Sequence, residues 1–205
     1  DILKYFDLID HAVLKENLSR LFKDSVLLEI FDLVIGSYQT ESGKGIPIGN
    51  LTSQYFANYY LSAADHFLLE KIHVPAYVRY MDDMVLWHND KEQLLKIRDS
   101  FTEFITSKLQ LNVKPVCLNF CSKGLPFLGY SMYPNGKRMN KSSRKRFRKK
   151  LKSNYDRLIK GEISQKQFVL HVKPMFAFAN HADYTCDLIK NVNKMEANYW
   201  TALTA

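Results

Sequence analysis

The stretch that most constrains this chain is Tyr80-Met81-Asp82-Asp83, where two adjacent acids separate two apolar runs. The runs at residues 76–80 and 84–87 are rich in apolar, β-branched and aromatic side chains. This pattern predicts a tight hairpin of two strands with a two-residue acidic tip. Carboxylates on a rigid tip suit Mg²⁺, a hard cation that binds carboxylate oxygens and shares them with phosphates. The alternative for the pair taken alone is a polar turn.

Length and composition indicate a folded chain. Its 205 residues suffice for one large domain or two small ones, and 46% are hydrophobic. No apolar run is long enough to cross a bilayer, and no signal peptide is visible. The formal net charge of +8 favours a polyanionic partner.

The chain has three cysteines: Cys117, Cys121 and Cys186. An odd, sparse set indicates a reducing compartment rather than a disulfide scaffold. The spacing of Cys117 and Cys121 fits no strong zinc motif, so buried thiols are expected instead.

Hydrophobic periodicity predicts helices after Asp10, from about residue 25 to 36, from 51 to 71, and after Asn89 or Asp90. A turn-rich loop at residues 45–50 opens the third of these. Such a loop can bring backbone N–H groups close to a phosphate or a base, or it can be a simple connection.

Strands are expected at 109–113, 116–120 and 126–133, followed by a turn at Pro134-Asn135-Gly136. Together with the acidic hairpin they predict an α+β fold, in which an antiparallel sheet is backed by helices.

The composition changes after residue 136. Residues 137–152 contain ten Lys or Arg and no acid, with Phe147 and Leu151 on a narrow apolar stripe. Gly161 should end this helix, and a capping box at residues 164–167 should begin another. Pro174 should kink or end that second helix, and a third should follow at 188–199.

Taken together, these motifs resemble the palm of a reverse transcriptase. Residues 1–6 resemble the first catalytic motif, residues 46–54 the second, and Tyr80 to Asp83 the third. Lys114 stands where the fourth motif carries its basic residue. The primer-grip hairpin of the family is matched by Phe127, Leu128, Gly129 and Tyr130.

The resemblance covers about two-thirds of the chain and implies RNA-directed DNA polymerase activity. It implies a palm over residues 1–136, with part of a fingers-like helical region, and a small all-α thumb over residues 137–205. The N-terminal fingers strands of the family are not in this sequence, so we expect a fragment of a longer protein.

The second motif indicates which subfamily of reverse transcriptases the chain resembles. Most reverse transcriptases carry Pro-Gln-Gly and then Ser-Pro, whereas this chain has Pro47-Ile48-Gly49 and Ser53-Gln54. That variant resembles the enzymes of diversity-generating retroelements, found in bacteria and their phages, which implies error-prone cDNA synthesis in the cytoplasm. The alternatives are a group II intron or retron-type enzyme or maturase, and a non-catalytic nucleic-acid-binding module.

The resemblance also implies the metal site. Nucleotidyl transfer uses two Mg²⁺ ions about 3.5–4 Å apart, and Mn²⁺ is the other candidate ion. Asp1 and Asp82 would bind them, Asp83 would contribute from outside, and the backbone carbonyl of Ile2 would complete one site. Lys114 would protonate or neutralise pyrophosphate; the alternative is an ordinary solvated lysine.

The substrate site would comprise Phe6, Ile48, Gly49 and Gln54. Phe6 would be a steric gate against the ribose 2′-OH, or alternatively a core residue. Ile48 replaces a Gln that can donate and accept hydrogen bonds, so its presence would lower fidelity. The alternative is that Ile48 packs under its loop.

The basic helix would contact template–primer phosphates, with a solvated charged face or a localisation signal as alternatives. Its expected contacts are Arg144, Lys145, Arg148, Lys149 and Lys152. The partners would be template RNA, DNA primer or cDNA, and dNTPs. A small basic accessory protein often works with the family, and no membrane contact is expected.

Overall fold

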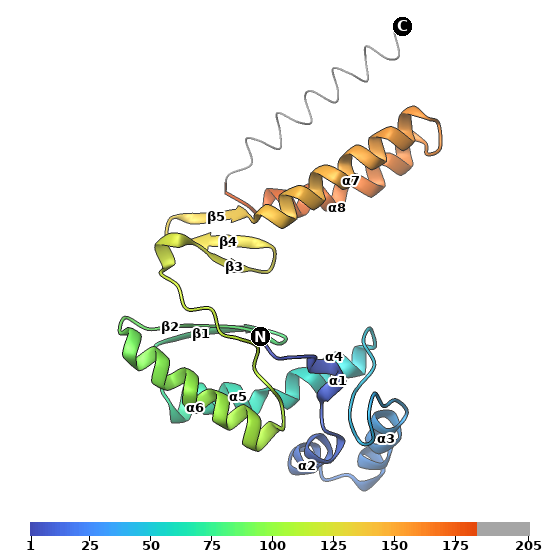
Figure 1. Ribbon diagram of the computed structural model, residues 1–205. Helices are drawn as coiled ribbons and strands as arrows, with labels where there is room; N and C mark the ends of the chain where they lie inside the picture. Colours follow the sequence, from blue (N-terminus) through green and yellow to red (C-terminus); the bar gives the residue numbers. More distant parts are fainter. Residues whose placement is uncertain (184–205) are drawn as a thin grey trace, which may run out of the picture. The chain divides into compact units, whose positions relative to one another are not determined.

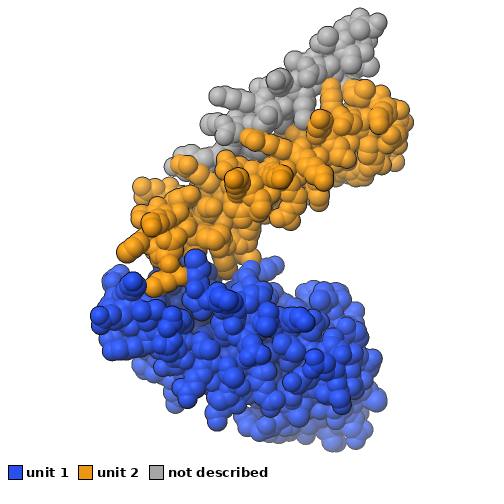
Figure 2. All heavy atoms as spheres, in the orientation of Figure 1, with its two compact units in different colours: residues 1–117 blue, residues 118–205 orange. Residues whose placement is uncertain are grey.

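The computed structural model describes residues 1–183 and confirms the α+β class. The chain forms two compact units, residues 1–117 and residues 118–205 (Figure 2). The palm–thumb boundary expected at residue 136 falls inside the second unit. The division into palm and thumb therefore does not coincide with the compact units, and it stays a prediction.

Helices dominate the first unit (Figure 1). They are α1 (Tyr5–Leu8), α2 (His11–Leu21), α3 (Ser25–Gly36), α4 (Leu51–Tyr60), α5 (Ser62–His66), the π-helical turn η1 (Phe67–Lys71) and α6 (Lys91–Leu109). Side-chain caps fix where three of them begin. Asp10, Asp24 and Asp90 each accept a hydrogen bond from a backbone N–H of the first turn, which satisfies a donor with no intrahelical partner.

The acidic hairpin consists of β1 (Ala76–Tyr80) and β2 (Asp83–Trp87), paired antiparallel with Tyr80 opposite Asp83. The two-residue loop is therefore Met81-Asp82, and the expected tip of Asp82 and Asp83 was displaced by one residue. Met81 has φ = 56°, the positive value that the favoured two-residue hairpin turns require at this position. Asp83 is consequently held in the strand.

One face of this hairpin packs on helices and the other is open. Tyr77, Met84 and Leu86 contact the core of the first unit, whereas Val78 and Tyr80 on the opposite face are exposed. At the centre of that core, Tyr60 is fully buried and donates a hydrogen bond to the backbone oxygen of Leu109 at 2.7 Å. The core thus gives the hairpin a rigid base.

The second unit combines a three-stranded sheet with two helices. The sheet has the order β3 (Leu125–Phe127), β4 (Tyr130–Tyr133), β5 (Gly136–Met139), and is preceded by the 3₁₀ turn η2 (Cys121–Lys123). The helices are α7 (Lys141–Ile159) and α8 (Gln165–Asn180). Its own hydrophobic core joins sheet and helices through Tyr130, Met139, Phe147 and Leu151.

Several local predictions are confirmed in this unit. The turn after β4 lies at Pro134-Asn135, and the capping box of Ser164 and Gln167 is present. Helix α7 ends just before Gly161, which has φ = 72°.

Other sequence expectations were wrong. Residues 109–113 form a helix end and a single bridge, because α6 continues to Leu109 and Gln110 then adopts a left-handed conformation. Residues 116–120 form no strand, and the stretch 126–133 is broken by a turn at Leu128-Gly129. Of the two expected effects of Pro174, a kink or an end of the helix, the end was wrong, because α8 continues through Pro174.

Cys117 and Cys121 are exposed free thiols rather than buried ones. Cys186 and the expected third helix at 188–199 lie outside the described residues. No helix within residues 1–183 is long and apolar enough to cross a membrane.

Candidate active site

A short ladder at the start of the chain brings Asp1 next to Lys114. Ile2 bridges antiparallel to Val113, and the N–H of Lys114 donates to the backbone oxygen of Asp1 at 2.9 Å. The Lys114 Nζ donates to Asp1 Oδ2 at 2.6 Å. Both side chains are about two-fifths exposed, at 41% and 39%, so the ion pair is open to solvent and to exchange with other charged groups.

The hairpin carboxylates lie near the start of the chain. The carboxylates of Asp83 and Asp82 and the ammonium of Lys114 all act electrostatically on the backbone nitrogen of Asp1. The three acids and the lysine therefore share one electrostatic neighbourhood.

Asp82 and Asp83 are half-buried, and neither carboxylate has an ion-pair or hydrogen-bond partner among residues 1–183. Two adjacent carboxylates without a protein cation repel each other, and a divalent cation would relieve that repulsion. The hairpin thus carries uncompensated negative charge.

The donor chemistry fits Mg²⁺, because carboxylate oxygens are its preferred protein ligands. Within the described part of the chain, however, no three His, Cys, Asp or Glu side chains are already arranged around one point. Asp1 is turned to Lys114 instead. The acids fit a metal by type and by neighbourhood, and metal binding would require Asp1 to exchange its lysine partner for the ion.

The loop before α4 is tied to the segment that contains Phe6. The N–H of Ile46 donates to the backbone oxygen of Phe6, and that of Gly45 to Ile9, both at 2.9 Å. His11 Nε2–H donates to the Gly45 oxygen at 2.7 Å. Phe6 itself is half-buried, edge-to-face with Tyr5 at 5.6 Å between ring centroids. The structure thus brings the first two predicted motifs together.

Beyond this anchor the loop is exposed. The Ile48 side chain is 77% exposed, so it does not pack under its loop and that alternative is wrong. Gly49 has φ = 102° with open space around its Cα, so the backbone conformation and not crowding favours glycine there. Gln54 is exposed on the first turn of α4. The side chains of Ile48 and Gln54 and the backbone of Gly49 are therefore accessible to a ligand.

The predicted primer-grip hairpin is the β3–β4 turn of the second unit. Leu128 and Gly129 form its two-residue loop, with φ = 49° and 85°. A Cβ on Gly129 would lie 2.9 Å from the Phe178 ring and 3.0 Å from Ser143 Oγ. The Tyr130 hydroxyl donates to the Phe178 oxygen at 2.7 Å. The tip of this hairpin is therefore packed against α7 and α8.

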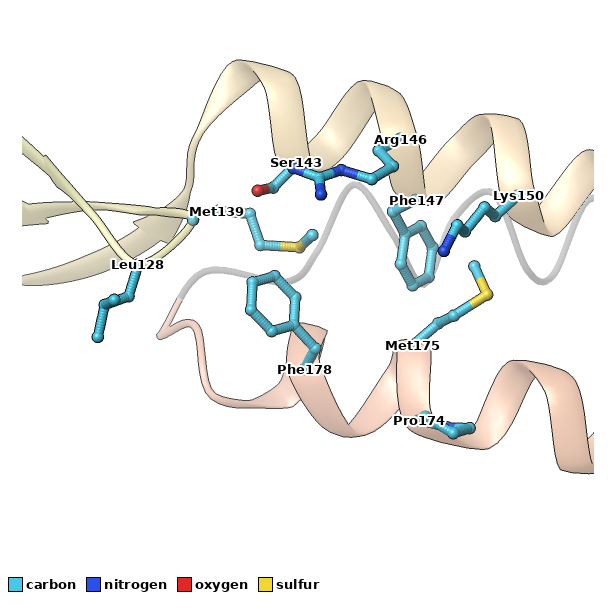
Figure 3. A pocket seen from close by; sticks show the side chains of 10 residues that line it. Leu128, Met139, Ser143, Arg146, Phe147, Lys150, Pro174, Met175 and Phe178 are labelled. Atoms are coloured by element: carbon cyan, nitrogen blue, oxygen red, sulfur yellow. The ribbon is translucent and has the colours of Figure 1, made fainter. Parts of the chain in front are cut away.

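A pocket of about 410 Å³ lies beside this tip. Figure 3 shows Met139, Phe147, Met175 and Phe178 projecting into the space between the two helices. The walls are mainly apolar, with Arg146 and Lys150 as the charged residues of the lining.

The predicted nucleic-acid contacts lie on the open face of α7. All five are exposed, whereas Ser143, Phe147 and Leu151 face the core of the unit. Within residues 1–183, none of the five forms an ion pair with an acid. The five residues, which we call the cationic face of α7, are Arg144, Lys145, Arg148, Lys149 and Lys152.

Sequence reasoning missed the polar cluster that holds the acidic hairpin. Asn58 on α4, Asp65 on α5 and Arg79 on β1 are joined by hydrogen bonds. The one available signal was a charged residue, Arg79, inside an apolar strand next to Tyr80, which requires a partner if buried.

Comparison with known proteins agrees with the geometry. A family model described as reverse transcriptase (RNA-dependent DNA polymerase) matches residues 1–132. No curated protein matches the chain. The matched range contains the Asp1–Lys114 ladder, the loop before α4, the acidic hairpin and the β3–β4 turn.

Proposed function

The chain belongs to the reverse transcriptase family, and we propose that it adds dNTPs to a primer 3′ end on an RNA template. The family generally depends on divalent metal ions and binds template, primer and dNTPs. The observation that carries the proposal is the hairpin of Asp82 and Asp83, uncompensated and in the same electrostatic neighbourhood as Asp1.

Asp1, Asp82 and Asp83 would hold two Mg²⁺ ions, with the backbone carbonyl of Ile2 as a further ligand. Such ions polarise phosphoryl oxygens and stabilise the attacking and leaving oxygens of an in-line displacement. Lys114 would leave Asp1 when the carboxylate binds metal, and its ammonium would then neutralise the departing pyrophosphate. Their ion pair holds both groups ready beside each other.

The nucleotide would lie against Phe6 and the loop before α4. The ring of Phe6 would exclude a ribose 2′-OH, and Gly49 and Gln54 would face the incoming nucleotide or its templating base. The hydrogen bond between Ile46 and Phe6 supports a shared role, because it fixes the gate relative to the loop.

Template and primer would bind the cationic face of α7 and the β3–β4 turn. Five exposed cations that have no acidic partner among residues 1–183 suit a phosphate backbone.

Within the family, we infer a diversity-generating retroelement enzyme that is error-prone, cytoplasmic, and encoded by a bacterium or phage. Pro47-Ile48-Gly49 supports this, since an exposed Ile48 offers no hydrogen bond to the base pair. A group II intron or retron-type enzyme is the second candidate. The retained Asp1, Asp82 and Asp83 speak against a non-catalytic module. We propose a small basic accessory protein as a further partner of this enzyme.

Primer extension on an RNA template tests this assignment. Asp82→Ala should reduce synthesis by roughly 100-fold or more, since a bound metal supplies several kcal/mol in the transition state. Asp99→Ala, an exposed acid on α6, is the matched control and should retain full activity. Synthesis by Asp82→Ala at the unmutated rate would refute the role of the hairpin.

A further inference from the structure

The guanidinium of Arg79 uses all of its N–H groups around the acidic hairpin. Nε donates to Asp65 Oδ1 at 2.7 Å and Nη2 to Asp65 Oδ2. Nη1 donates to Asn58 Oδ1 and to the backbone oxygen of Met81, both at 3.0 Å. Nη2 also reaches the Asn58 backbone oxygen at 3.4 Å. An arginine has five such donors in a fixed planar fork, and here each has an acceptor.

This cluster joins the hairpin loop to two helices. Asn58 lies on α4 and Asp65 on α5, while Met81 is the first residue of the loop. Asn58 Nδ2 also donates to Met81 Sδ at 3.2 Å, so both the backbone and the side chain of Met81 are held. Met81 is a non-glycine residue with φ = 56°, a conformation that persists only where its surroundings impose it.

The residue that follows Met81 is Asp82, one of the three acids that would bind metal in the proposed function. A rotation at the Met81–Asp82 peptide would swing the Asp82 side chain away from Asp1, and misplacement by about 1 Å can cost roughly 100-fold in rate. The hydrogen bond from Arg79 to the Met81 oxygen opposes that rotation directly.

Arg79 is not a counter-ion for the hairpin acids. Its charge is matched by Asp65, and the two side chains are 13% and 26% exposed. The hydrogen bonds to Asp65 raise the pKa of Arg79 against the effect of burial. The negative charge of Asp82 and Asp83 is thus left for another cation.

We propose that Arg79, with Asn58, is a positioning residue that locks the loop of the acidic hairpin so that Asp82 faces its metal site. The inference rests on the proposed function, because it concerns the same carboxylates. Arg79 touches neither substrate nor metal in this account; it acts through the Met81 backbone.

Three variants of the purified protein test it. Arg79→Lys keeps the charge but loses the planar fork and cannot reach Asp65 and Met81 together. Asn58→Ala removes an exposed side chain that contacts both Arg79 and Met81, so it tests the loop even if Arg79→Lys folds poorly. Tyr77→Phe is the matched control: its hydroxyl donates to Asp65 Oδ1 at 2.8 Å but does not reach the loop.

Two readouts separate positioning from stability, both taken well below the melting temperature of each variant. The first is kcat and KM for dNTP in primer extension. The second is Mn²⁺ binding without substrate, followed by the electron paramagnetic resonance signal of the free ion. We expect Arg79→Lys to lower kcat by ~10- to 100-fold and Asn58→Ala by ~3- to 10-fold, with KM changed less than ~3-fold. Both should weaken Mn²⁺ binding, and Tyr77→Phe should change neither readout.

Folded Arg79→Lys and Asn58→Ala with unmutated kcat and Mn²⁺ affinity would overturn the inference, as would equal losses in Tyr77→Phe. A different result would refute the proposed function: an unmutated protein that binds Mn²⁺ but extends no primer. In that case weaker Mn²⁺ binding by Arg79→Lys, but not by Tyr77→Phe, would still support positioning. An unmutated protein that binds no Mn²⁺ would overturn it.

Discussion

The two compact units differ in sign of charge. Residues 1–117 carry 12 Lys or Arg and 16 Asp or Glu, a net charge of −4, whereas residues 118–205 carry 17 and 5, a net charge of +12. An acidic surface concentrates metal ions but repels phosphates, and a basic surface does the reverse. The difference suggests a division of labour: chemistry in the first unit and nucleic-acid affinity in the second.

The units also have separate hydrophobic cores. Damage to one core should therefore leave the fold of the other intact, and the predictions below use that independence.

The largest expected effect comes from truncating one core side chain in each unit. Phe147→Ala, at a position 5% exposed, should destabilise the second unit by about 3–5 kcal/mol, and Ile105→Ala, fully buried in α6, should cost the first unit about 2–5 kcal/mol. Hydrogen exchange resolved by peptide would show each loss in its own unit. If either variant loosened both units equally, the cores would not be independent.

The next effect concerns the cationic face of α7. Replacing Lys145, Lys149 and Lys152 with Gln should weaken binding to any template–primer and reduce the slope of log affinity against log salt by roughly 2 to 3, because each phosphate contact releases counterions. Affinity titrations at several salt concentrations measure it.

A matched triple change on the first unit controls for net charge. Lys91, Lys96 and Lys108 are exposed on α6, and their replacement by Gln should leave the slope unchanged. Equal slopes for the two triple variants would show that affinity follows total charge and not the α7 face.

The fold was predictable where the determinants are local. The caps at Asp10 and Asp90, the Gly161 stop and the Ser164–Gln167 box each depend on residues within one turn. The segment at 109–113 was predicted wrongly because Leu109 and Leu111 alternate as in a strand. Both are buried, at 2% and 0%, but for a tertiary reason that alternation cannot reveal.

The candidate site likewise combines residues that are adjacent in the sequence with contacts between residues far apart in it. Asp82 and Asp83 could be proposed as candidate ligands because the hairpin and its acids are adjacent in the sequence. The contacts of Arg79 with Asn58 and Asp65 span 21 and 14 residues, so no local pattern announces them. The pairing of Asp1 with Lys114 spans 113 residues, and only the family resemblance placed the two residues together.

The two units should also differ in how much stability they lose at alkaline pH, and this effect is smaller. Burial raises the pKa of Tyr5, Tyr60 and Tyr77 in the first unit, so their stabilisation is complete below pH 10 and is lost as the unfolded chain ionises above it. In the second unit, burial raises the pKa of Tyr130.

Thermal melts between pH 9 and 11 test this difference. Above pH 10 the first unit should lose about 1.4 kcal/mol per pH unit for each buried tyrosine. Tyr60→Phe should reduce that dependence, although it also loses the hydrogen bond to Leu109. Parallel losses in both units would contradict the assignment.

The smallest expected effect is on fidelity. Ile48→Gln restores an amide that can bond the nucleotide, and one such bond is worth about 0.5–1.5 kcal/mol, or several-fold in discrimination. Misincorporation should fall, most clearly opposite template adenine, while synthesis persists. Sequencing of cDNA from a defined RNA measures it, with Ile48→Val as the apolar control. An error spectrum identical to the parent would remove Ile48 from the fidelity account.

The division of labour is tested most directly by measuring synthesis and template–primer affinity together in two variants. Asp82→Ala should abolish synthesis while binding template–primer as tightly as the unmutated protein, or slightly more tightly because one repulsive charge is gone. The triple variant at Lys145, Lys149 and Lys152 should bind weakly yet approach the unmutated kcat at saturating template–primer. Loss of affinity in Asp82→Ala, or loss of kcat at saturation in the triple variant, would contradict the assignment of catalysis to the first unit and of nucleic-acid affinity to the second.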